Sequence, residues 1–522
     1  MRSSGFRAIV VSGLTVLALA LSACGGGESG GAQQGAAEGE PQPGGVLKIS
    51  MQADGGDLDP AHTAPSPVGW GNLMYPIFDT LVRVDEEGNV VPRIATEVTT
   101  EDGGSTWTVV LRTGVEFSDG TPFDAEAVRY NWERYRLPTS VGVADAQQIA
   151  EMAVVDDTTL TVTLIAPNSG FPYLLQGALG MIGSPTAIES LGDAYSVSPV
   201  AAGPFVVTDR VAGSKTTYER NPTYWDAPRP YLDGLEISIV AEGTQAARTL
   251  QSGRLDVATQ LPPDTWAQLE NAEGIETHRV PSMGGYAFWM NNAKAPTDDV
   301  RIRRALYLAI DPQVANEQVA QGAAEVVTHL FQEDSPYYVP EAELPWNGDV
   351  AEAQELIDSV VAETGGPVSI ELLWLNGMPQ WPQAYAQQVT EKLDGIEINV
   401  VPATAAEIGA RLYDNSFEML FSIMQGPDPV TVMYERLHCE SARNNLDYCN
   451  PEMDTALEEA RRATTTEDRV AAIARAQAIF VEDVPLLFQS RSDMTFAARS
   501  EVGGMEFFTT GFLAVEQAWL AD

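Results

Sequence analysis

Apolar and polar residues alternate from Trp107 to Phe117, and this period of two predicts a half-buried strand. Residues 118–120 (Ser-Asp-Gly) then supply turn chemistry, because Gly tolerates positive φ and Asp bonds to its own backbone. Residues 121–135 open with Thr-Pro, and their apolar positions recur at helical spacing. This stretch therefore predicts a strand, a tight turn and a helix.

Strand and helix patterns alternate along the rest of the chain, which indicates α/β architecture. The chain has 522 residues, more than one hydrophobic core usually serves, so two or more lobes are expected. Further predicted strands cover residues 45–50, 156–165, 283–292, 368–375 and 396–401, and predicted helices cover residues 302–311, 351–362, 383–393, 450–462 and 469–480.

The N-terminus carries an export signal. Arg2 and Arg7 precede an apolar run over residues 8–21 that is too short for a stable membrane span. Leu-Ser-Ala-Cys-Gly follows at residues 21–25 and resembles a bacterial lipobox. We expect a signal peptide over residues 1–23, lipid attachment at Cys24 and a flexible Gly-rich tether over residues 24–44. These features predict that the chain lies at the outer face of the bacterial cytoplasmic membrane, or on its periplasmic side, anchored at Cys24.

Charge and cysteine content limit which partners and sites the chain can have. The formal net charge of −43 argues against a nucleic-acid partner, which requires basic surfaces. Besides Cys24, the chain contains only Cys439 and Cys449, and two nearby cysteines in an exported protein favour a disulfide. A metal site that includes His438 is the alternative, although the adjacent Cys and His lack further ligands at good spacing.

Several motifs resemble the family 5 extracellular solute-binding proteins, the peptide, oligosaccharide and nickel receptors of ATP-driven importers. The run LRTGVEFSDGTPFDAEAV at residues 111–128 is similar to the family signature. The resemblance extends from Gly45 to about Val484. Its other motifs are Leu58-Asp59-Pro60, Ala202 to Phe205, Glu219 to Trp225, Gln251 to Asp256 and Val300 to Asp311.

The resemblance implies a two-lobed periplasmic-binding-protein-like fold (type II) with an extra subdomain in the first lobe, as in peptide receptors. We expect lobe 1 over residues 45–282, with an inserted subdomain at about residues 80–195. Lobe 2 is expected over residues 283–488, and residues 489–522 are expected to return to lobe 1. Such lobes close on a ligand by hinge motion.

The resemblance also assigns ligand-binding positions. In peptide receptors of the family, the ligand backbone pairs like an added strand with two cleft-edge segments. Those places are occupied here by Asp54-Gly55-Gly56 and by Phe421-Ser422-Ile423. Gln425 stands where these receptors have an Asp that grips the ligand's α-amino group, and Gln cannot form that ion pair. Asp428 follows and is a candidate to replace it if the loop shifts.

Aromatic residues give a second set of candidates, because Trp stacks on sugar faces and also fills apolar pockets. Packing in the core is the alternative for each of them. The set consists of Tyr286, Phe288, Trp289, Trp374 and Trp381.

We therefore expect a receptor of an ABC importer that captures a peptide or peptide-like solute and delivers it to permease and ATPase subunits. An oligosaccharide receptor of the same family is the alternative. A secreted glycan- or peptide-degrading enzyme is disfavoured, since the G-x-S-x-G, H-E-x-x-H and phosphate-loop patterns are missing. We expect a monomer with no cofactor and no metal, because the four histidines are scattered and none lies in a segment matched to the cleft.

Overall fold

The computed structural model describes residues 39–63, 71–85, 89–280, 284–346, 348–375, 378–424, 426, 428–463, 465–508 and 511–521. The predicted signal peptide, Cys24, most of the predicted tether and Gln425 lie outside these residues.

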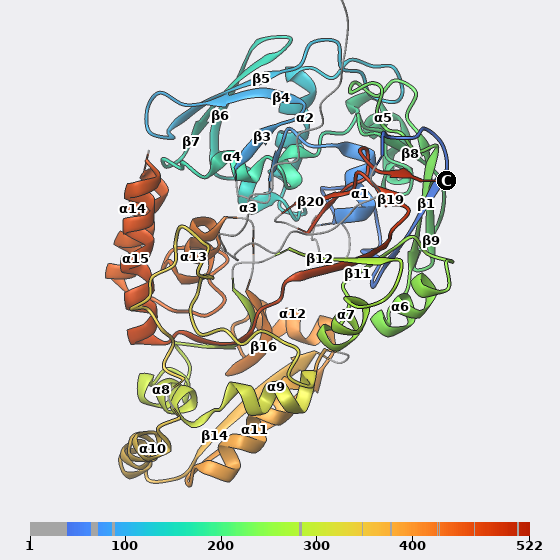
Figure 1. Ribbon diagram of the computed structural model, residues 1–522. Coiled ribbons are helices and arrows are strands. Elements are labelled where there is room, and N and C mark those ends of the chain that lie inside the picture. The colour runs from blue at the N-terminus through green and yellow to red at the C-terminus, as the bar shows by residue number, and fades with distance from the viewer. Residues whose placement is uncertain are drawn as a thin grey trace, which may run out of the picture. The chain divides into compact units, whose positions relative to one another are not determined.

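A seven-stranded sheet has the order β12-β18-β11-β1-β10-β9-β8 (Figure 1). Strand β1 (Val46–Met51) runs parallel to both of its neighbours, and its Leu47 and Ile49 are fully buried. Strand β18 (Met494–Arg499) comes from the C-terminal part of the chain and pairs between β11 and β12. The other strands are β8 (Phe205–Val211), β9 (Lys215–Arg220), β10 (Gly234–Ile239), β11 (Val257–Thr259) and β12 (Ile275–Val280), and the helices nearby are α1 (Gly71–Phe78), α6 (Gly243–Gln251) and α7 (Pro263–Leu269).

A four-stranded antiparallel sheet has the order β4-β5-β7-β6. Its burial alternates along β5 (Thr106–Leu111) and β7 (Thr159–Leu164), as expected for a sheet with one face on a core. The remaining elements of this region are β2 (Val82–Val84), β3 (Val90–Pro92), β4 (Ala95–Thr99), β6 (Ile149–Asp156), α2 (Ala125–Tyr135), α3 (Val143–Ala146), α4 (Phe171–Leu174), α5 (Pro185–Leu191) and the 3₁₀ turns η1 (Ala178–Gly180) and η2 (Gly192–Ser196).

The bounds of the opening strand-turn-helix differ from the prediction. Strand β5 ends at Leu111 instead of Phe117, and a turn follows at residues 113–114, where Gly114 has a positive φ of 75°. Helix α2 begins at Ala125, not at Thr121, because Asp124 is the N-cap and accepts a hydrogen bond from the backbone N–H of Ala127. The predicted strand over residues 156–165 is the second strand of the β6–β7 hairpin and starts at Thr159.

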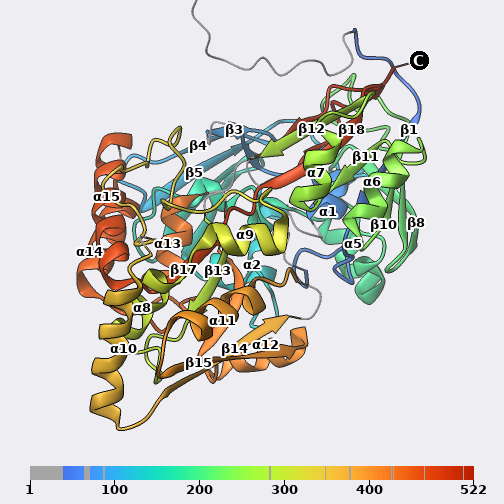
Figure 2. The same ribbon diagram turned by 60° about the horizontal axis from the view of Figure 1, so that its bottom comes forward.

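A five-stranded sheet has the order β15-β14-β16-β13-β17 (Figure 2). It forms one hydrophobic core with the helices that lie between β13 and β17 in the sequence. Its strands are β13 (Gly285–Met290), β14 (Val368–Leu375), β15 (Ile396–Ala403), β16 (Met419–Met424) and β17 (Leu486–Ser490). The helices are α8 (Val300–Ala309), α9 (Pro312–Ala320), α10 (Val350–Thr364), α11 (Trp381–Lys392), α12 (Ala405–Tyr413), α13 (Pro429–Leu437), α14 (Pro451–Arg462) and α15 (Thr466–Asp483). Two short C-terminal ladders pair β19 (Val502–Gly503) with β22 (Trp519–Leu520) and β20 (Glu506–Phe507) with β21 (Leu513–Ala514).

A buried charge network fixes the C-terminal segment. Asp79 accepts hydrogen bonds from Arg83 Nη2 at 3.1 Å, Arg93 Nη2 at 3.0 Å and the Tyr224 hydroxyl at 2.8 Å. Arg83 also pairs with Glu516 at 2.5 Å, which links residues 433 positions apart. Burial alone raises the pKa of Asp79, but Arg93, Arg83 and the hydrogen bonds outweigh it and hold the pKa well below its usual range.

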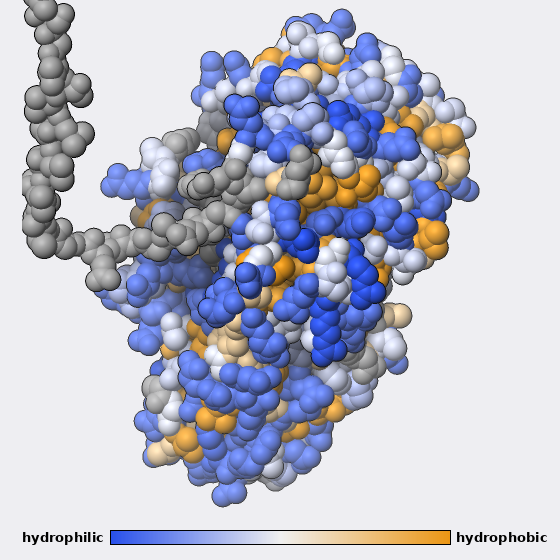
Figure 3. All heavy atoms as spheres, turned by 45° about the vertical axis from the view of Figure 1, so that its right-hand side comes forward, coloured by the Kyte–Doolittle hydropathy of each residue, from blue (hydrophilic) through white to orange (hydrophobic). Residues whose placement is uncertain are grey.

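Hydrophilic side chains predominate among the described residues on the face drawn in Figure 3, and apolar ones form small separate patches. This surface agrees with the formal charge of −43. No helix among the described residues combines the length and apolar character needed to cross a bilayer.

Candidate ligand-binding site

The five-stranded sheet brings most of the predicted aromatic residues onto one face. Strands β13 and β16 pair Tyr286 with Ile423 and Phe288 with Phe421, and strand β14 places Trp374 opposite Phe421. Because side chains alternate along a strand, these five residues point to the same side. The Tyr286 and Phe421 rings lie 5.7 Å apart with an interplanar angle of 14°.

Part of this face is covered. Phe288 is 0% exposed and stacks on Tyr385 of α11 at 4.1 Å, and Phe421 and Trp381 are buried in the same core. In the described structure the side chains of Phe288, Phe421 and Trp381 therefore pack in the core with α11, and ligand contact at these positions stays a prediction. The half-buried residues at the end of this face are Tyr286, Trp374 and Ile423, and the half-buried Ser422 points to the opposite face.

Trp289 lies on the opposite face of the sheet, since it follows Phe288 along β13. It is 4% exposed, and the Arg436 guanidinium of α13 lies over its ring at 4.8 Å. Burial lowers the pKa of Arg436. Trp289 therefore points away from the face that carries Tyr286, and its contact with a ligand stays a prediction.

Within the described part of the chain, the end of strand β16 has one backbone edge without a strand partner, beside the half-buried aromatic residues. Its pairing with β14 ends at Phe421, whereas its pairing with β13 continues to Met424. Among the described residues, which leave out 376–377 after β14, residues 422–424 therefore pair with a strand on one side only. Trp374 lies at the end of the β14 ladder, and its buried indole N–H has no hydrogen-bond partner among the described residues.

Gly284 and Gly285 allow the chain to enter β13 at this point. A Cβ on Gly284 would lie 2.1 Å from the Met424 carbonyl oxygen, and one on Gly285 would lie 2.1 Å from the Ser490 carbonyl oxygen. Gly284 also has a positive φ of 81°. Any side chain at these positions would force β16 and β17 away from β13.

The Asp54 carboxylate is already occupied. It pairs with Arg210 at 2.6 Å and accepts a hydrogen bond from the backbone N–H of Gly213 at 2.6 Å. Arg210 also donates to the Gly56 carbonyl at 3.3 Å. These contacts fix the segment against the β8–β9 hairpin and leave Gly55 half-buried and Gly56 exposed, so backbone groups are what this segment can offer a ligand.

Asp428, the candidate to replace the amine anchor if the loop shifts, already has partners within the protein. It is the N-cap of α13, and it accepts hydrogen bonds from the Thr431 backbone N–H at 2.9 Å and hydroxyl at 2.6 Å. Its other oxygen forms an ion pair with Arg469, and the side chain is 2% exposed. Gln425 lies outside the described residues, so the prediction for that position stays a prediction.

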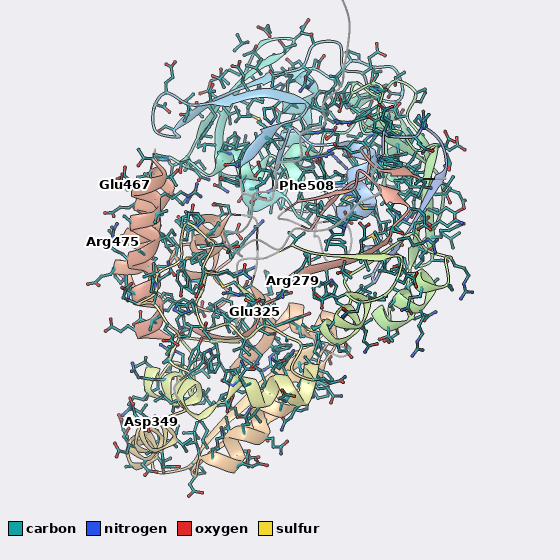
Figure 4. The ribbon with its side chains drawn as sticks, viewed as in Figure 1. Arg279, Glu325, Asp349, Glu467, Arg475 and Phe508 are labelled. Carbon is teal, nitrogen blue, oxygen red and sulfur yellow. A yellow bond between two sulfur atoms is a disulfide. The ribbon has the colours of Figure 1, made fainter. Side chains whose placement is uncertain are left out.

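An ion network that the sequence analysis missed lies where the chain crosses between the two large sheets. Arg279 at the end of β12 pairs with Glu325 at 2.8 Å, and Figure 4 labels both residues. Arg279 also pairs with Asp493 at 2.5 Å. The buried Arg491 donates to the carbonyls of Leu330 and His329 at 2.9 and 2.7 Å. The partners of Arg279 are 46 and 214 residues away, so no local sequence signal identifies them.

A disulfide links Cys439 to Cys449 with a Cα–Cα distance of 4.6 Å. The loop it closes carries Arg443, which pairs with Glu435 of α13 at 2.7 Å and with Asp145 of α3 at 3.5 Å. Burial raises the pKa of Asp145, and Arg443 partly opposes that rise. The loop therefore joins the four-stranded-sheet region to helix α13.

Within the part of the chain that the structure describes, no group of three or more His, Cys, Asp or Glu side chains has the arrangement to hold a metal ion. The His438 ring is buried and stacks on the Tyr434 ring at a centroid distance of 4.2 Å. A second histidine, His278, has its pKa lowered by burial.

A family model for bacterial extracellular solute-binding proteins, family 5 (middle), matches residues 89–444. Protein XP55 of Streptomyces lividans is 28% identical over 448 residues, 82% of this chain and 81% of that protein. The probable D,D-dipeptide-binding periplasmic protein DdpA of Escherichia coli is 26% identical over 479 residues, 88% of this chain and 91% of that protein.

Among solved structures, the ABC transporter-associated periplasmic binding protein DppA from Helicobacter pylori, in complex with the peptide STSA, has a TM-score of 0.80. It is 22% identical, and the match covers 92% of this chain and 99% of that one. The likeness confirms the predicted α/β fold of two-lobed periplasmic binding proteins. With two thirds of its length matched by the family model, the chain belongs to the bacterial extracellular solute-binding proteins of family 5, as its motifs predicted.

Proposed function

We propose that the chain is the receptor of an ABC importer and that it captures a peptide or peptide-like solute. The observation that carries the proposal is the free edge of β16 at residues 422–424, beside the half-buried Tyr286 and Trp374. An extended ligand can pair with such an edge as an added strand, and alternate side chains then meet the aromatic residues. DdpA is named as a probable D,D-dipeptide-binding protein, which supports a peptide-like ligand.

In this proposal the ligand is held by backbone pairing and aromatic contact rather than by an ion pair to its amino group. Asp54 and Asp428 are the carboxylates that the resemblance placed at the cleft, and Arg210 and Arg469 already neutralise them. A ligand ammonium would have to displace a buried Arg, which leaves that Arg unpaired and costs several kcal/mol.

An oligosaccharide is the second candidate ligand. Tyr286 and Trp374 present half-buried aromatic surface, and Trp rings stack on sugars as well as on apolar side chains. The free strand edge favours the peptide, because a sugar has no repeating backbone amides to pair with it.

The proposal also covers how the bound solute reaches the transporter. The folded chain is exported, anchored through lipid on Cys24 and tethered by residues 24–44. It acts as a monomer, with lobes bounded near residues 283 and 488 that close on the solute and present it to permease subunits, while ATPase partners supply the energy. In this role it performs no covalent chemistry and needs no cofactor.

Isothermal titration with a pool of short peptides and the same pool acetylated at the N-terminus tests the proposal. Because the two cleft carboxylates are engaged, acetylation is expected to change affinity by less than about tenfold, or ~1.4 kcal/mol. Loss of binding on acetylation would show that an amine anchor exists and would refute the proposed binding mode. Binding of oligosaccharides alone would refute the ligand class.

A further inference from the structure

Helices α13, α14 and α15 lie next to the region of the four-stranded sheet (Figure 1). In the part of the chain that the structure describes, the buried apolar residues of these two regions form separate cores. Hydrogen bonds, an ion pair and a cation–π contact join the regions across the boundary. Polar boundaries of this kind are those at which parts of a chain separate and rejoin.

Arg443 forms the ion pair across this boundary. Its guanidinium lies 3.5 Å from the Asp145 carboxylate of α3 and 2.7 Å from the Glu435 carboxylate of α13. All three side chains are half-buried, so solvent screens their interaction less than it screens an exposed pair. One guanidinium is therefore shared between a carboxylate of each region. We call Arg443, Asp145 and Glu435 the clasp.

Arg461, near the end of α14, makes two more contacts across the boundary. Its side chain donates a hydrogen bond to Gln148 Oε1 at 3.1 Å, and its backbone carbonyl accepts one from the backbone N–H of Ser169 at 2.8 Å. The Ser169 amide thus belongs to one region and its acceptor to the other. Hydrogen exchange at this amide therefore reports whether the two regions are together.

The Cys439–Cys449 disulfide closes the loop that carries Arg443. Helix α13 ends at Leu437 and α14 begins at Pro451, so the bond ties the ends of both helices together at the base of this loop. Cys449 is exposed and Cys439 is half-buried, so a thiol in solution can reach the bond. Exposed disulfides belong to the class that is reduced most readily.

We propose that the disulfide is a redox switch for the clasp: the oxidised loop holds Arg443 within reach of Asp145, and the reduced loop moves and lets the two regions part. A dithiol reductant supplies the two electrons. One of its thiolates attacks Cys449 Sγ, and Cys439 leaves as a thiolate and takes up a proton. The second thiol of the reductant then releases Cys449 as a thiol and closes the reductant's own disulfide. This inference goes beyond the proposed function and does not depend on which solute the chain binds.

The test uses the full chain without added solute, dithiothreitol as the reductant, and hydrogen–deuterium exchange resolved to single amides by mass spectrometry. Reduction is expected to speed exchange of the Ser169 amide about fivefold, because a partly buried ion pair across the boundary is lost. The neighbouring Asn168 amide donates to the Gly104 carbonyl within its own region, so its exchange is expected to stay the same. Unchanged exchange at Ser169, or equal acceleration of both amides, would overturn the proposal.

Removal of the disulfide by mutation separates its effect from other effects of the reductant. The variant Cys439→Ser/Cys449→Ser is expected to exchange at Ser169 as the reduced wild type does, whether or not dithiothreitol is present. This variant keeps Cys24, the remaining cysteine of the chain. A response of its Ser169 amide to dithiothreitol as large as that of the wild type would overturn the assignment to the Cys439–Cys449 bond.

The variant Asp145→Asn tests whether the disulfide acts through the clasp. It keeps the shape of the side chain but removes the charge that Arg443 reaches, so Ser169 is expected to exchange faster in the oxidised variant, and reduction is expected to add little. A response to reduction as large as that of the wild type would show that the disulfide acts through α14 instead and would overturn the proposal. Asp157→Asn, at an exposed carboxylate in the turn between β6 and β7, is the matched control and is expected to exchange as the wild type does. Circular dichroism checks that each variant is folded.

Discussion

Replacing Asp79 with Asn tests how far the buried charge network holds the C-terminal segment. Asp79 is fully buried and receives hydrogen bonds from Arg83, Arg93 and Tyr224. Asp79 and Glu516 are the buried carboxylates that balance the guanidinium groups of Arg83 and Arg93. The substitution keeps the shape of the Asp79 side chain but removes its negative charge. Breaking a buried pair in this way costs about 3–5 kcal/mol, because a charge remains uncompensated.

Hydrogen–deuterium exchange at residues 502–520 reports the loss of stability in this segment alone. The measurement therefore does not assume that a protein of this size unfolds in one step. We expect faster exchange there in Asp79→Asn, since Glu516 holds the segment through Arg83. The control is Asp226→Asn, a half-buried carboxylate 3.8 Å from Arg93, which is expected to cost at most about 1 kcal/mol. If Asp79→Asn and Asp226→Asn accelerated exchange at residues 502–520 equally, the claim that burial makes Asp79 more important would be refuted.

The pH dependence of the network has a defined sign. The pKa of Asp79 is lower in the folded than in the unfolded chain, so its stabilisation is present above the unfolded value of about 3.9. It is lost as the pH falls below that value toward the folded pKa. Residues 502–520 of the wild type are expected to lose protection in this acid range more steeply than those of Asp79→Asn, and parallel acid profiles would contradict the assignment.

Two further predictions concern the site and the loop. Trp374→Ala is expected to weaken ligand binding by about 1–3 kcal/mol in titration calorimetry, whereas Tyr413→Ala, which removes an aromatic ring that is 94% exposed on α12, is expected to leave it unchanged. An unchanged affinity in Trp374→Ala would assign that residue to packing alone. Cys439→Ser/Cys449→Ser is expected to lower the stability of the α13–α14 region by about 2–4 kcal/mol, and to remove the effect of a reducing agent on the melting temperature. A melting temperature that does not respond to reductant in the wild type would contradict this.

Local pattern predicted many elements well. The strand expected over residues 368–375 is β14 with the same bounds, and the helix expected over residues 450–462 is α14, which begins one residue later because Asn450 is its N-cap. Both depend on interactions within a few residues: alternation along the strand, and a cap followed by Pro at the first turn of the helix.

The candidate site was harder to predict, because the role of each residue depends on a distant partner. Asp54 is occupied by Arg210, 156 residues away, and Asp428 by Arg469, 41 residues away. Whether Phe288 meets a ligand or the core depends on α11, which lies more than 90 residues later in the chain and covers it through Tyr385. Only packing separates the covered aromatic residues from Tyr286 and Trp374.

A cavity at the edge of β4 is a second feature that the sequence does not predict. Residues 95–99 carry the alternation of a strand, yet the sequence contains no sign that their outer edge faces a cavity closed by α15. Such a cavity is a product of tertiary contacts between segments more than 350 residues apart.

Native mass spectrometry of the purified chain from Gly45 onward, followed by identification of any molecule released on unfolding, tests the central claim most directly. The proposed function predicts release of peptides, including species whose N-terminus is blocked, since no free carboxylate at the described cleft positions selects for an amine. Release of a glycan and no peptide would contradict it.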